Sequence, residues 1–408
     1  MSTTIDARRA AVGTQATLPR REPLLSDALL ERIGQRAADY DRDNRFFSED
    51  LDELKAAGFL RASVPEAFGG LGYTLPELLR EQTRLAHRAP ATALALNMHL
   101  YWAGAALHLW RLGDRSGDWI LEAIGRGDVF AAGHGEPGND LGLADSFVKA
   151  TPLPGGGYRF VGRKIFTSLS PAWNWLGIHA KDDSDPAQPK IVHAFVRRAS
   201  EGHRTATTWD ALGLRATRSD DTWLEGVEVA PEHVIRVLPA GDPDDRFVDG
   251  ILGAVLPGLG AVYYGAARRA FDLAIASATT RRSNALDGRP YAYKPLTQYN
   301  VAQAAIRLDS IEALLERTAQ RWWDGFADDE PWLARLLAAK QHAVEGALDV
   351  VNQSLRIVGA ASLSRRNELE RLYRDVRAGA FHPPNADATY ELIGQSWLGV
   401  LGKTGKPG

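Results

Sequence analysis

The run Ile191-Val192-His193-Ala194-Phe195-Val196 lies near the middle of the chain and separates two regions of helical spacing. It is short and rich in β-branched and apolar side chains, which favours a strand. A similar run, Tyr158-Arg159-Phe160-Val161, comes earlier, directly after Pro154-Gly155-Gly156-Gly157, which has the composition of a hairpin connection. Gly and Pro punctuate the whole region closely. We therefore predict a β domain over residues 127–240.

Helical spacing of apolar residues precedes this β domain. It begins near Leu24, with Ser48 as a possible N-cap and Gly58 as a C-terminal stop. Further helices are predicted over Leu75–Ala86, Ala91–Arg111 and Trp119–Arg126. The first 23 residues show no sustained period, so we expect them to form a flexible arm.

Helical spacing also follows the β domain. Apolar residues recur with helical period from Ile251 to Leu273, and the predicted helices after them are Ala302–Trp323, Pro331–Val358 and Leu369–Val376. The predicted domains are helical at 24–126, β at 127–240 and a four-helix bundle at 241–402, with a tail at 403–408. The fold class is thus mainly α with a central β domain.

The composition narrows the classes of function. The chain has 408 residues, a formal net charge of -3 and no long basic block, which gives no electrostatic footprint for nucleic acid or an anionic membrane. It has no cysteine, so thiolate catalysis, iron–sulfur clusters and Cys-ligated zinc are excluded. No apolar run approaches the roughly 20 residues that span a bilayer. We expect a cytoplasmic protein that acts on a small molecule and takes any redox chemistry from a cofactor.

Two glycine-containing strings resemble nucleotide-binding motifs but do not fit a nucleotide-binding fold, and the histidine spacing does not fit a metal site. Residues 133–138 spell G-x-G-x-x-G, but no helical spacing follows directly and no βαβ unit surrounds them. Gly402-Lys403-Thr404 ends like a Walker loop, yet the required first glycine is Trp397. No histidine pair has the i,i+4 spacing of a metal-binding helix, so no metal is expected.

Five short strings, in this order, resemble landmarks of the acyl-CoA dehydrogenase superfamily. The resemblance runs from about Leu24 to Gly402, and its strings are residues 64–72 (Val-Pro-Glu to Gly-Gly-Leu-Gly), 135–138 (Gly-Glu-Pro-Gly), 162–168 (Gly-Arg-Lys-Ile-Phe-Thr-Ser), 214–219 (Leu-Arg-Ala-Thr-Arg-Ser) and 370–375 (Glu-Arg-Leu-Tyr-Arg-Asp). The resemblance implies an N-terminal helical domain, a middle β domain and a C-terminal helical bundle. It also implies a flavin cofactor and a homotetramer that completes its cofactor sites between subunits.

The sequence departs from the dehydrogenases of this family at the catalytic base. The family glutamate lies nine residues beyond the arginine that matches Arg374, and that position is Pro383. A minority takes its glutamate from the first long C-terminal helix, at the position of Gly250. Asp249 is adjacent, but one residue turns a side chain by about 100° around a helix.

The resemblance extends to a second branch of the superfamily, flavin-dependent monooxygenases such as dibenzothiophene monooxygenase. These enzymes take reduced flavin from a separate reductase and oxygenate small molecules through a C4a-hydroperoxyflavin, without an α-proton base. The resemblance implies Ser168 as a flavin-facing hydroxyl and His382 as a catalytic histidine. His99, on a helix that borders the substrate pocket in this fold, is a third catalytic candidate, because a neutral imidazole suits proton transfer. Each histidine can equally be a structural residue.

The resemblance also implies a set of cofactor contacts. They are His134, Gly135, Phe166, Ser168, Arg282, Gln298 and Gly359. Gly135 replaces the family threonine, and the glycine-rich string at Gly359 keeps only its first glycine, so the flavin can be FAD or FMN. A reduced-flavin monooxygenase is the preferred function. An acyl-CoA dehydrogenase with a displaced base, and a non-catalytic relative of the same fold, are the alternatives.

Overall fold

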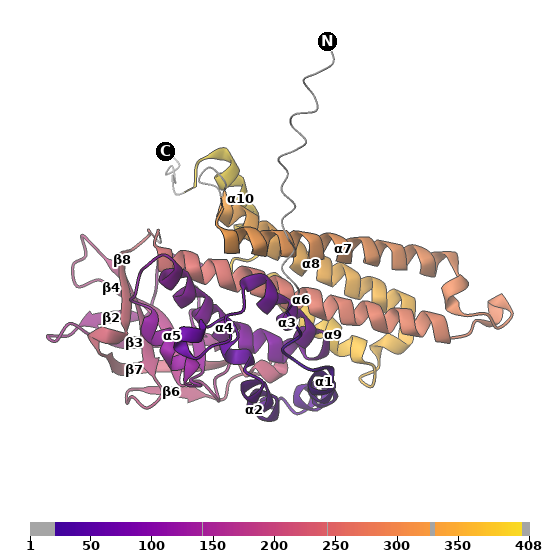
Figure 1. Cartoon of the computed structure of the whole chain (residues 1–408), viewed down its shortest axis with the longest axis horizontal. Coiled ribbons are helices and arrows are strands. Elements are labelled where there is room, and N and C mark those ends of the chain that lie inside the picture. The colour runs from indigo at the N-terminus through magenta and orange to yellow at the C-terminus, as the bar shows by residue number, and fades with distance from the viewer. Residues whose placement is uncertain (1–20, 141, 243, 327–330, 402–408) are drawn as a thin grey trace, which may run out of the picture.

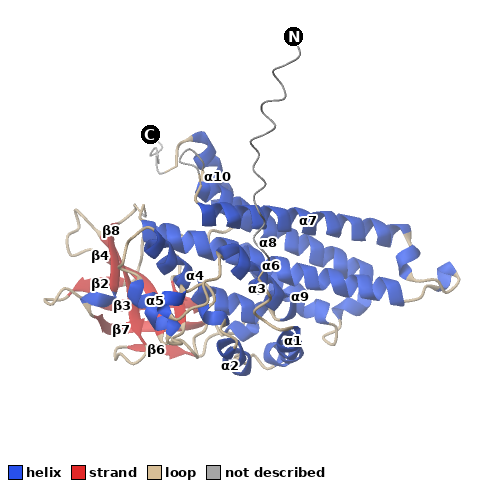
Figure 2. Cartoon of the chain, in the orientation of Figure 1, coloured by secondary structure: helices blue, strands red, loops and turns tan. Residues whose placement is uncertain are grey.

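The computed structural model describes residues 21–140, 142–242, 244–326 and 331–401. Residues 1–20 of the predicted arm and the tail at 403–408 lie outside the described residues. The described chain runs from helices through a sheet to a second set of helices, which Figure 2 shows with the strands gathered at one end.

The first helices begin and end where local sequence signals place them. Ser26 accepts a hydrogen bond from Leu29 N at the first helix, and Thr74 and Glu77 form a capping box at the third. Gly58, with a φ of 82°, follows the second helix in the left-handed conformation that glycine adopts easily. These helices are α1 (Asp27–Arg42), α2 (Ser48–Ala56), α3 (Leu75–Arg88), α4 (Pro90–Arg111) and α5 (Asp118–Gly125).

Eight strands form a single mixed sheet in the order β6-β7-β3-β2-β4-β5-β8, and β1 pairs in parallel with β4. The predicted hairpin at 154–157 joins the antiparallel strands β2 and β3. The strands are β1 (Phe130–Gly133), β2 (Lys149–Pro152), β3 (Tyr158–Thr167), β4 (Trp175–Asp182), β5 (Lys190–Arg197), β6 (His203–Ala206), β7 (Asp220–Val229) and β8 (Val234–Pro239). Most of β4 and β5 is buried. Strand β5 contains the apolar run at 191–196.

The C-terminal helices form the bundle in Figure 1, where α6 runs from the sheet to the far end of α7 and α8. They are α6 (Arg246–Thr280), α7 (Pro295–Asp324), α8 (Trp332–Val358), α9 (Glu368–Arg377) and α10 (Ala386–Leu398). Among the described residues α6 alone is long and apolar enough to cross a membrane, but 83% of its apolar window is buried inside the protein. Its composition is thus that of the central helix of a bundle.

Helix α4 joins the sheet to the bundle through Trp102, which is 1% exposed. The Trp102 indole donates to Ala131 O on β1, and its ring lies against Phe195 and Phe247. A Cβ at Gly177 would lie 2.2 Å from the indole, so only glycine permits this approach of helix and sheet. Helix α4 is therefore packed tightly against the sheet at this point.

The predicted fold class is confirmed, with two differences in detail. Helix α7 begins at Pro295, before the apolar spacing that starts at Ala302, because proline is well suited to the first turn of a helix. Helix α10 was not predicted, although Asn385 accepts a hydrogen bond from Ala388 N as its N-cap. Short 3₁₀ turns complete the described chain: Phe59–Arg61, Glu66–Phe68, Gly142–Ala144, Arg215–Thr217, Pro231–His233, Asn284–Leu286, Tyr291–Tyr293, Gly359–Leu363 and Ala378–Phe381.

Candidate active site

The loop after α9 carries His382 and Pro383. His382 Nε2 lies 2.6 Å from the hydroxyl of Tyr263 on α6. Lys340 on α8 donates to the backbone oxygens of His382, at 3.1 Å, and Pro384, at 2.7 Å. Burial lowers the pKa of His382 to about 4, and the nearby Lys340 cation adds to this effect. His382 is therefore a neutral imidazole at pH 7, held from two helices.

Neither family position for a carboxylate base carries one. Pro383 is exposed and offers no proton acceptor on its side chain. A Cβ at Gly250 would lie 2.9 Å from Ala105 Cα, so α6 and α4 leave no room for a side chain there. Asp249 is half-buried, and its pKa is raised to about 6 by burial and by Asp244 and Asp245.

Phe166 and Ser168 lie at a corner where the backbone turns unusually. Phe166 is in the left-handed region at φ 58°, and Leu169, Leu214 and Arg218 share that conformation nearby. The Phe166 side chain is 62% exposed, which presents an apolar ring at the surface. The Ser168 hydroxyl is 2.8 Å from Ser219 Oγ. An exposed aromatic ring beside a fixed hydroxyl fits a planar, polar-edged ligand such as a flavin ring.

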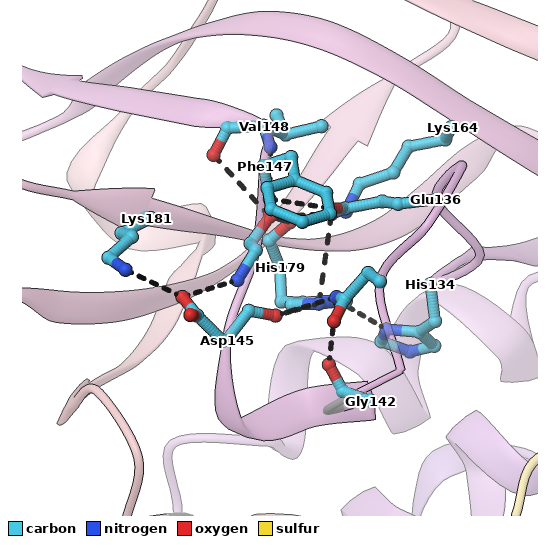
Figure 3. A network of polar contacts seen from close by, with 11 residues as sticks. His134, Glu136, Gly142, Asp145, Phe147, Val148, Lys164, His179 and Lys181 are labelled. Carbon is cyan, nitrogen blue, oxygen red and sulfur yellow. Dashed lines mark hydrogen bonds and ion pairs between the residues drawn. The ribbon is translucent and has the colours of Figure 1, made fainter.

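His134 and Gly135 follow β1 and adjoin the same corner. Gly135 pairs with Ile165, and a Cβ at Gly135 would lie 2.7 Å from Ile165 O. This close approach excludes the threonine that the family carries there. His134 Nδ1 lies 3.1 Å from His179 Nδ1, a contact that Figure 3 draws as a dashed line. His134 Nε2 is buried and has no hydrogen-bond partner among the described residues.

Glu136, beside these residues, is fully engaged in a buried network (Figure 3). Its carboxylate accepts from the Lys164 ammonium, from Ser146 Oγ at 2.5 Å and from Phe147 N at 2.6 Å. Lys164 is 0% exposed and also donates to His179 O at 2.6 Å. Burial lowers the pKa of Lys164 to about 8, against the opposing effect of Glu136. The network fixes the loop after β1 and leaves no free carboxylate for catalysis.

His99 lies in the core, away from any ligand surface. Its Nε2 donates to Leu60 O at 2.9 Å, and its Nδ1 accepts from Phe130 N at 3.0 Å. The residue is 0% exposed, and burial lowers its pKa to about 4. Because both ring nitrogens bind backbone groups, the prediction that His99 moves a proton at the substrate is not supported by this geometry.

The other three predicted cofactor contacts lie at the far end of α6. Arg282 donates to Gly288 O at 3.3 Å, and Gln298 donates to Ala292 O at 3.0 Å. Arg281 donates to Val358 O at 2.7 Å, directly beside Gly359. Helix α6 has 35 residues, which gives a length of about 50 Å at 1.5 Å per residue. These residues are therefore distant from the first turn of α6, where Phe247 packs on His193 of the sheet.

A cleft that the sequence did not reveal lies between α3, α4, α6 and the end of α7. Its unfilled space is about 520 Å³, open mouth included. Gln82, Asn97, Tyr101 and the backbone of Gly104 line its buried part, together with Ser63. The hydroxyls of Ser63 and Tyr101 are buried and have no hydrogen-bond partner among the described residues. Tyr101 adjoins His99 in the sequence, but periodicity cannot tell which of these residues faces a cleft.

The outer part of the cleft is aromatic and basic. Trp322 stacks on His108 with ring centroids 5.0 Å apart. The Arg111 guanidinium lies 4.1 Å from the Trp323 ring centroid and donates to Trp323 O at 2.8 Å. Burial lowers the pKa of His108 to about 4. The cleft thus has an aromatic and basic outer part and polar groups at its buried end.

Comparison with known proteins identifies relatives along the whole chain. The family model for the acyl-CoA dehydrogenase N-terminal domain matches residues 25–114, and the model for the acyl-CoA dehydrogenase C-terminal domain matches residues 258–385. The Bacillus subtilis protein named "Putative acyl-CoA dehydrogenase YdbM" is 31% identical, over 89% of this chain and 95% of that protein.

Two further relatives carry the names of oxygen-transferring enzymes. L-evernosamine nitrososynthase of a Micromonospora species is 27% identical, over 97% of this chain and 95% of that protein. Dibenzothiophene monooxygenase of Mycolicibacterium goodii is 25% identical, over 83% of this chain and 84% of that protein. Among solved structures, KijD3 in complex with FMN and a dTDP-amino-keto sugar is 26% identical, with a TM-score of 0.80 over 91% of this chain and 92% of that chain.

Proposed function

This chain belongs to the acyl-CoA dehydrogenase family of flavin-dependent oxidoreductases, and we propose that within it the protein is a monooxygenase acting on a small organic molecule. In the overall reaction one oxygen atom of O2 enters the substrate and the other leaves as water. Reduced flavin supplies the two electrons. The flavin is FAD or FMN, and in this proposal a separate reductase delivers it in reduced form to a cytoplasmic enzyme.

The absence of a base at both family positions carries this proposal. Dehydrogenation of an acyl thioester needs a group that removes the α-proton, and general-base catalysis typically contributes about 10²- to 10⁴-fold. Pro383 has no such group, and the contact of Gly250 with Ala105 excludes one. Oxygenation does not require that proton to be removed. Relatives named as monooxygenases and nitrososynthases over most of the chain support the same function.

Two groups of this chain would hold the reacting part of the flavin. The exposed Phe166 ring and the Ser168 hydroxyl form one group, and the backbone around His134 and Gly135 forms the other. When bound, the flavin supplies the electrons and activates dioxygen. His382, neutral and tied to Tyr263, is the group that we assign to proton transfer near the reacting atoms.

The residues around the C-terminal end of α6 bear on the proposed homotetramer. Arg282 follows this end, and Gln298 and Gly359 are the other two cofactor candidates there. A guanidinium and backbone groups suit a phosphate-bearing tail. We infer that a neighbouring copy presents this second group to the flavin tail, as the family resemblance implies.

Isotope labelling tests the proposed reaction directly. Purified protein, reduced FMN or FAD and a candidate substrate are mixed with ¹⁸O2, and the product is analysed by mass spectrometry. We expect one labelled oxygen atom in the product and none when the protein is omitted. Flavin oxidation that yields only hydrogen peroxide, with every candidate amine, phenol and sulfur heterocycle, would count against monooxygenation.

One observation favours acyl-CoA dehydrogenation as a second candidate. Asp249 lies one residue from Gly250, the alternative base position, and its pKa is raised to about 6. It is therefore our candidate for the base that would remove the α-proton. Bleaching of protein-bound oxidised FAD by acyl-CoA thioesters would support it. An Asp249→Asn variant that bleaches as fast as the parent would remove that base. A protein that binds no flavin at all would instead support a non-catalytic relative.

A further inference from the structure

The 212–219 segment, which joins the outer strands of the sheet to the corner of Ser168, has an unusual backbone shape. Leu214 and Arg218 are both in the left-handed region, at φ 53° and φ 44°. Residues other than glycine adopt this conformation at a cost in free energy, so it persists only where neighbouring groups hold it. Leu214 is also 2% exposed, so its backbone N–H needs a partner within the protein.

Two consecutive residues near the end of α9 supply such contacts. The carboxylate of Asp375 accepts from Leu214 N at 2.6 Å through Oδ1. Arg374 Nη1 donates to Leu212 O at 2.9 Å. Between these two contacts, a Cβ at Gly213 would lie 2.4 Å from the carbonyl carbon of Arg374, so the backbones approach more closely than a larger residue permits. Helix α9 therefore fixes the start of the 212–219 segment.

Asp375 uses one oxygen for this contact, and its charge is not matched by a close partner. The residue is 2% exposed, and its Oδ2 has no hydrogen-bond partner among the described residues. Arg371 Nη1 lies 3.9 Å from that oxygen. Burial raises the pKa of Asp375 to about 6, against the opposing effect of Arg371. The accepting oxygen of Asp375, and not its charge, is therefore the part that contacts the 212–219 segment.

The other end of this segment reaches the flavin-facing corner. Thr217 N donates to Leu214 O at 3.0 Å, and Leu169 N donates to Thr217 O at 3.1 Å. The hydroxyls of Thr217, Ser219 and Ser168 follow one another at 2.7 and 2.8 Å, and all three side chains are buried. Because each hydroxyl donates only one hydrogen bond, the direction of the Ser168 O–H depends on the other two.

We propose that Asp375 is a positioning residue that, by holding Leu214 N, fixes the 212–219 segment and so orients the Ser168 hydroxyl for the flavin ring. This inference rests on the proposed flavin-dependent function. It means that a side chain of the C-terminal bundle determines how well the β domain holds the flavin. Helix α9 also leads to His382, so it connects both groups that we assign to the reacting centre.

Amide hydrogen exchange tests the first link without any flavin. We expect the Leu214 amide to exchange slowly in the parent protein and at least about tenfold faster in Asp375→Ala. Asp375→Asn keeps the accepting oxygen, so the amide should stay protected in that variant. Leu369→Ala is the matched control, because it removes a buried apolar side chain from the same helix. The Leu214 amide should stay protected in this control.

Fluorescence titration with oxidised FMN and FAD tests the second link. We expect the flavin affinity of folded Asp375→Ala to fall at least about tenfold and that of Asp375→Asn to be retained. Ser219→Ala breaks the row of hydroxyls, so it should lower flavin affinity while the Leu214 amide stays protected. Ser170→Ala is the matched control and should bind flavin as the parent does, since Ser170 is buried nearby but bonds to Asp220 Oδ2, at 2.6 Å.

Several results would overturn the proposal. They are full flavin affinity in Asp375→Ala, equal losses in Asp375→Ala and Leu369→Ala, and a parent protein that binds neither flavin. Asp375→Ser, whose side chain is too short to reach Leu214 N, carries the same expectation should Asp375→Ala not fold. Incorporation of ¹⁸O by the parent, with full flavin affinity in Asp375→Ala, would reject this inference alone. Weakened flavin binding in Asp375→Ala, without ¹⁸O incorporation by the parent, would reject only the proposed function.

Discussion

His382 Nε2 and the Tyr263 hydroxyl lie 2.6 Å apart, which joins the loop after α9 to the middle of α6. Burial raises the pKa of Tyr263 well above its ordinary value, so its hydroxyl stays protonated and His382 stays neutral at pH 7. The two side chains thus form a neutral pair. His382 directly precedes Pro383, the position that carries the glutamate base in the dehydrogenases of this family.

Tyr263→Phe should slow substrate oxygenation by about 10²-fold, because His382 would lose the group that orients it. Flavin affinity, measured by fluorescence titration, should change little. Tyr264→Phe is the control, because the adjacent side chain points about 100° around the helix. Equal loss in both variants would mean that the effect is one of general packing and not of the His382 contact.

His99→Phe should destabilise the protein and leave the chemistry of the remaining folded molecules intact. The substitution leaves Leu60 O and Phe130 N buried without partners, which costs about 2–5 kcal/mol in the free energy of unfolding. Denaturant unfolding and the rate per folded molecule are measured on the same sample. An unchanged unfolding curve with abolished turnover would restore His99 as a catalytic residue.

Gly250→Ala should lower the free energy of unfolding by about 1–3 kcal/mol, because overpacking pushes α6 away from Ala105. Gly394→Ala in α10 is the matched control, since no atom lies within 4 Å of the Cβ that it adds. That control should gain about 0.5–1 kcal/mol from helix propensity. Thermal unfolding of both variants decides the comparison, and equal stability of the two would show that α4 and α6 separate easily.

Acid should destabilise the protein between about pH 6.5 and pH 4. His99, His193 and His382 each have a pKa lowered to about 4 by burial, so the unfolded chain binds protons in this range that the folded chain does not. The stability from these neutral rings is fully present above pH 6.5, falls as the pH drops from 6.5 toward 4, and levels off below pH 4. Denaturant unfolding at several pH values should show that the free energy of unfolding decreases as the pH falls through this range. In His193→Phe this pH dependence should be smaller by the contribution of one histidine. A slope that is unchanged in the variant would exclude a contribution from His193.

Much of the fold could be predicted, because the period of apolar residues changes where the chain passes from helix to strand and back. The buried strand β5 at 191–196 and the hairpin at 154–157 are examples. The N-terminus of α7 was less predictable, since the buried residues of its first turns, Thr297 and Asn300, are polar and form no apolar stripe. Local signals at Pro295 and Asn385 mark the starts of α7 and α10.

The site was harder to predict than the fold. Motif order indicates Phe166, Ser168 and His382, because these positions follow recognisable strings. Helix α4 is buried on nearly all sides, so its sequence has no polar face from which to tell that Tyr101 lines a cleft and His99 does not.

The unbroken length of α6 has a consequence for how such an enzyme can change. In its first turn Phe247 packs against the Trp102 ring on α4, and its last residue, Thr280, lies two positions before Arg282, which is assigned to the cofactor tail. The length of α6 sets the spacing of these two places, so an insertion or deletion within it would change both the distance and the rotation between them. New substrate preferences can therefore arise by substitution of side chains on α3 and α4. Helix α6 itself tolerates substitutions but not a change of length.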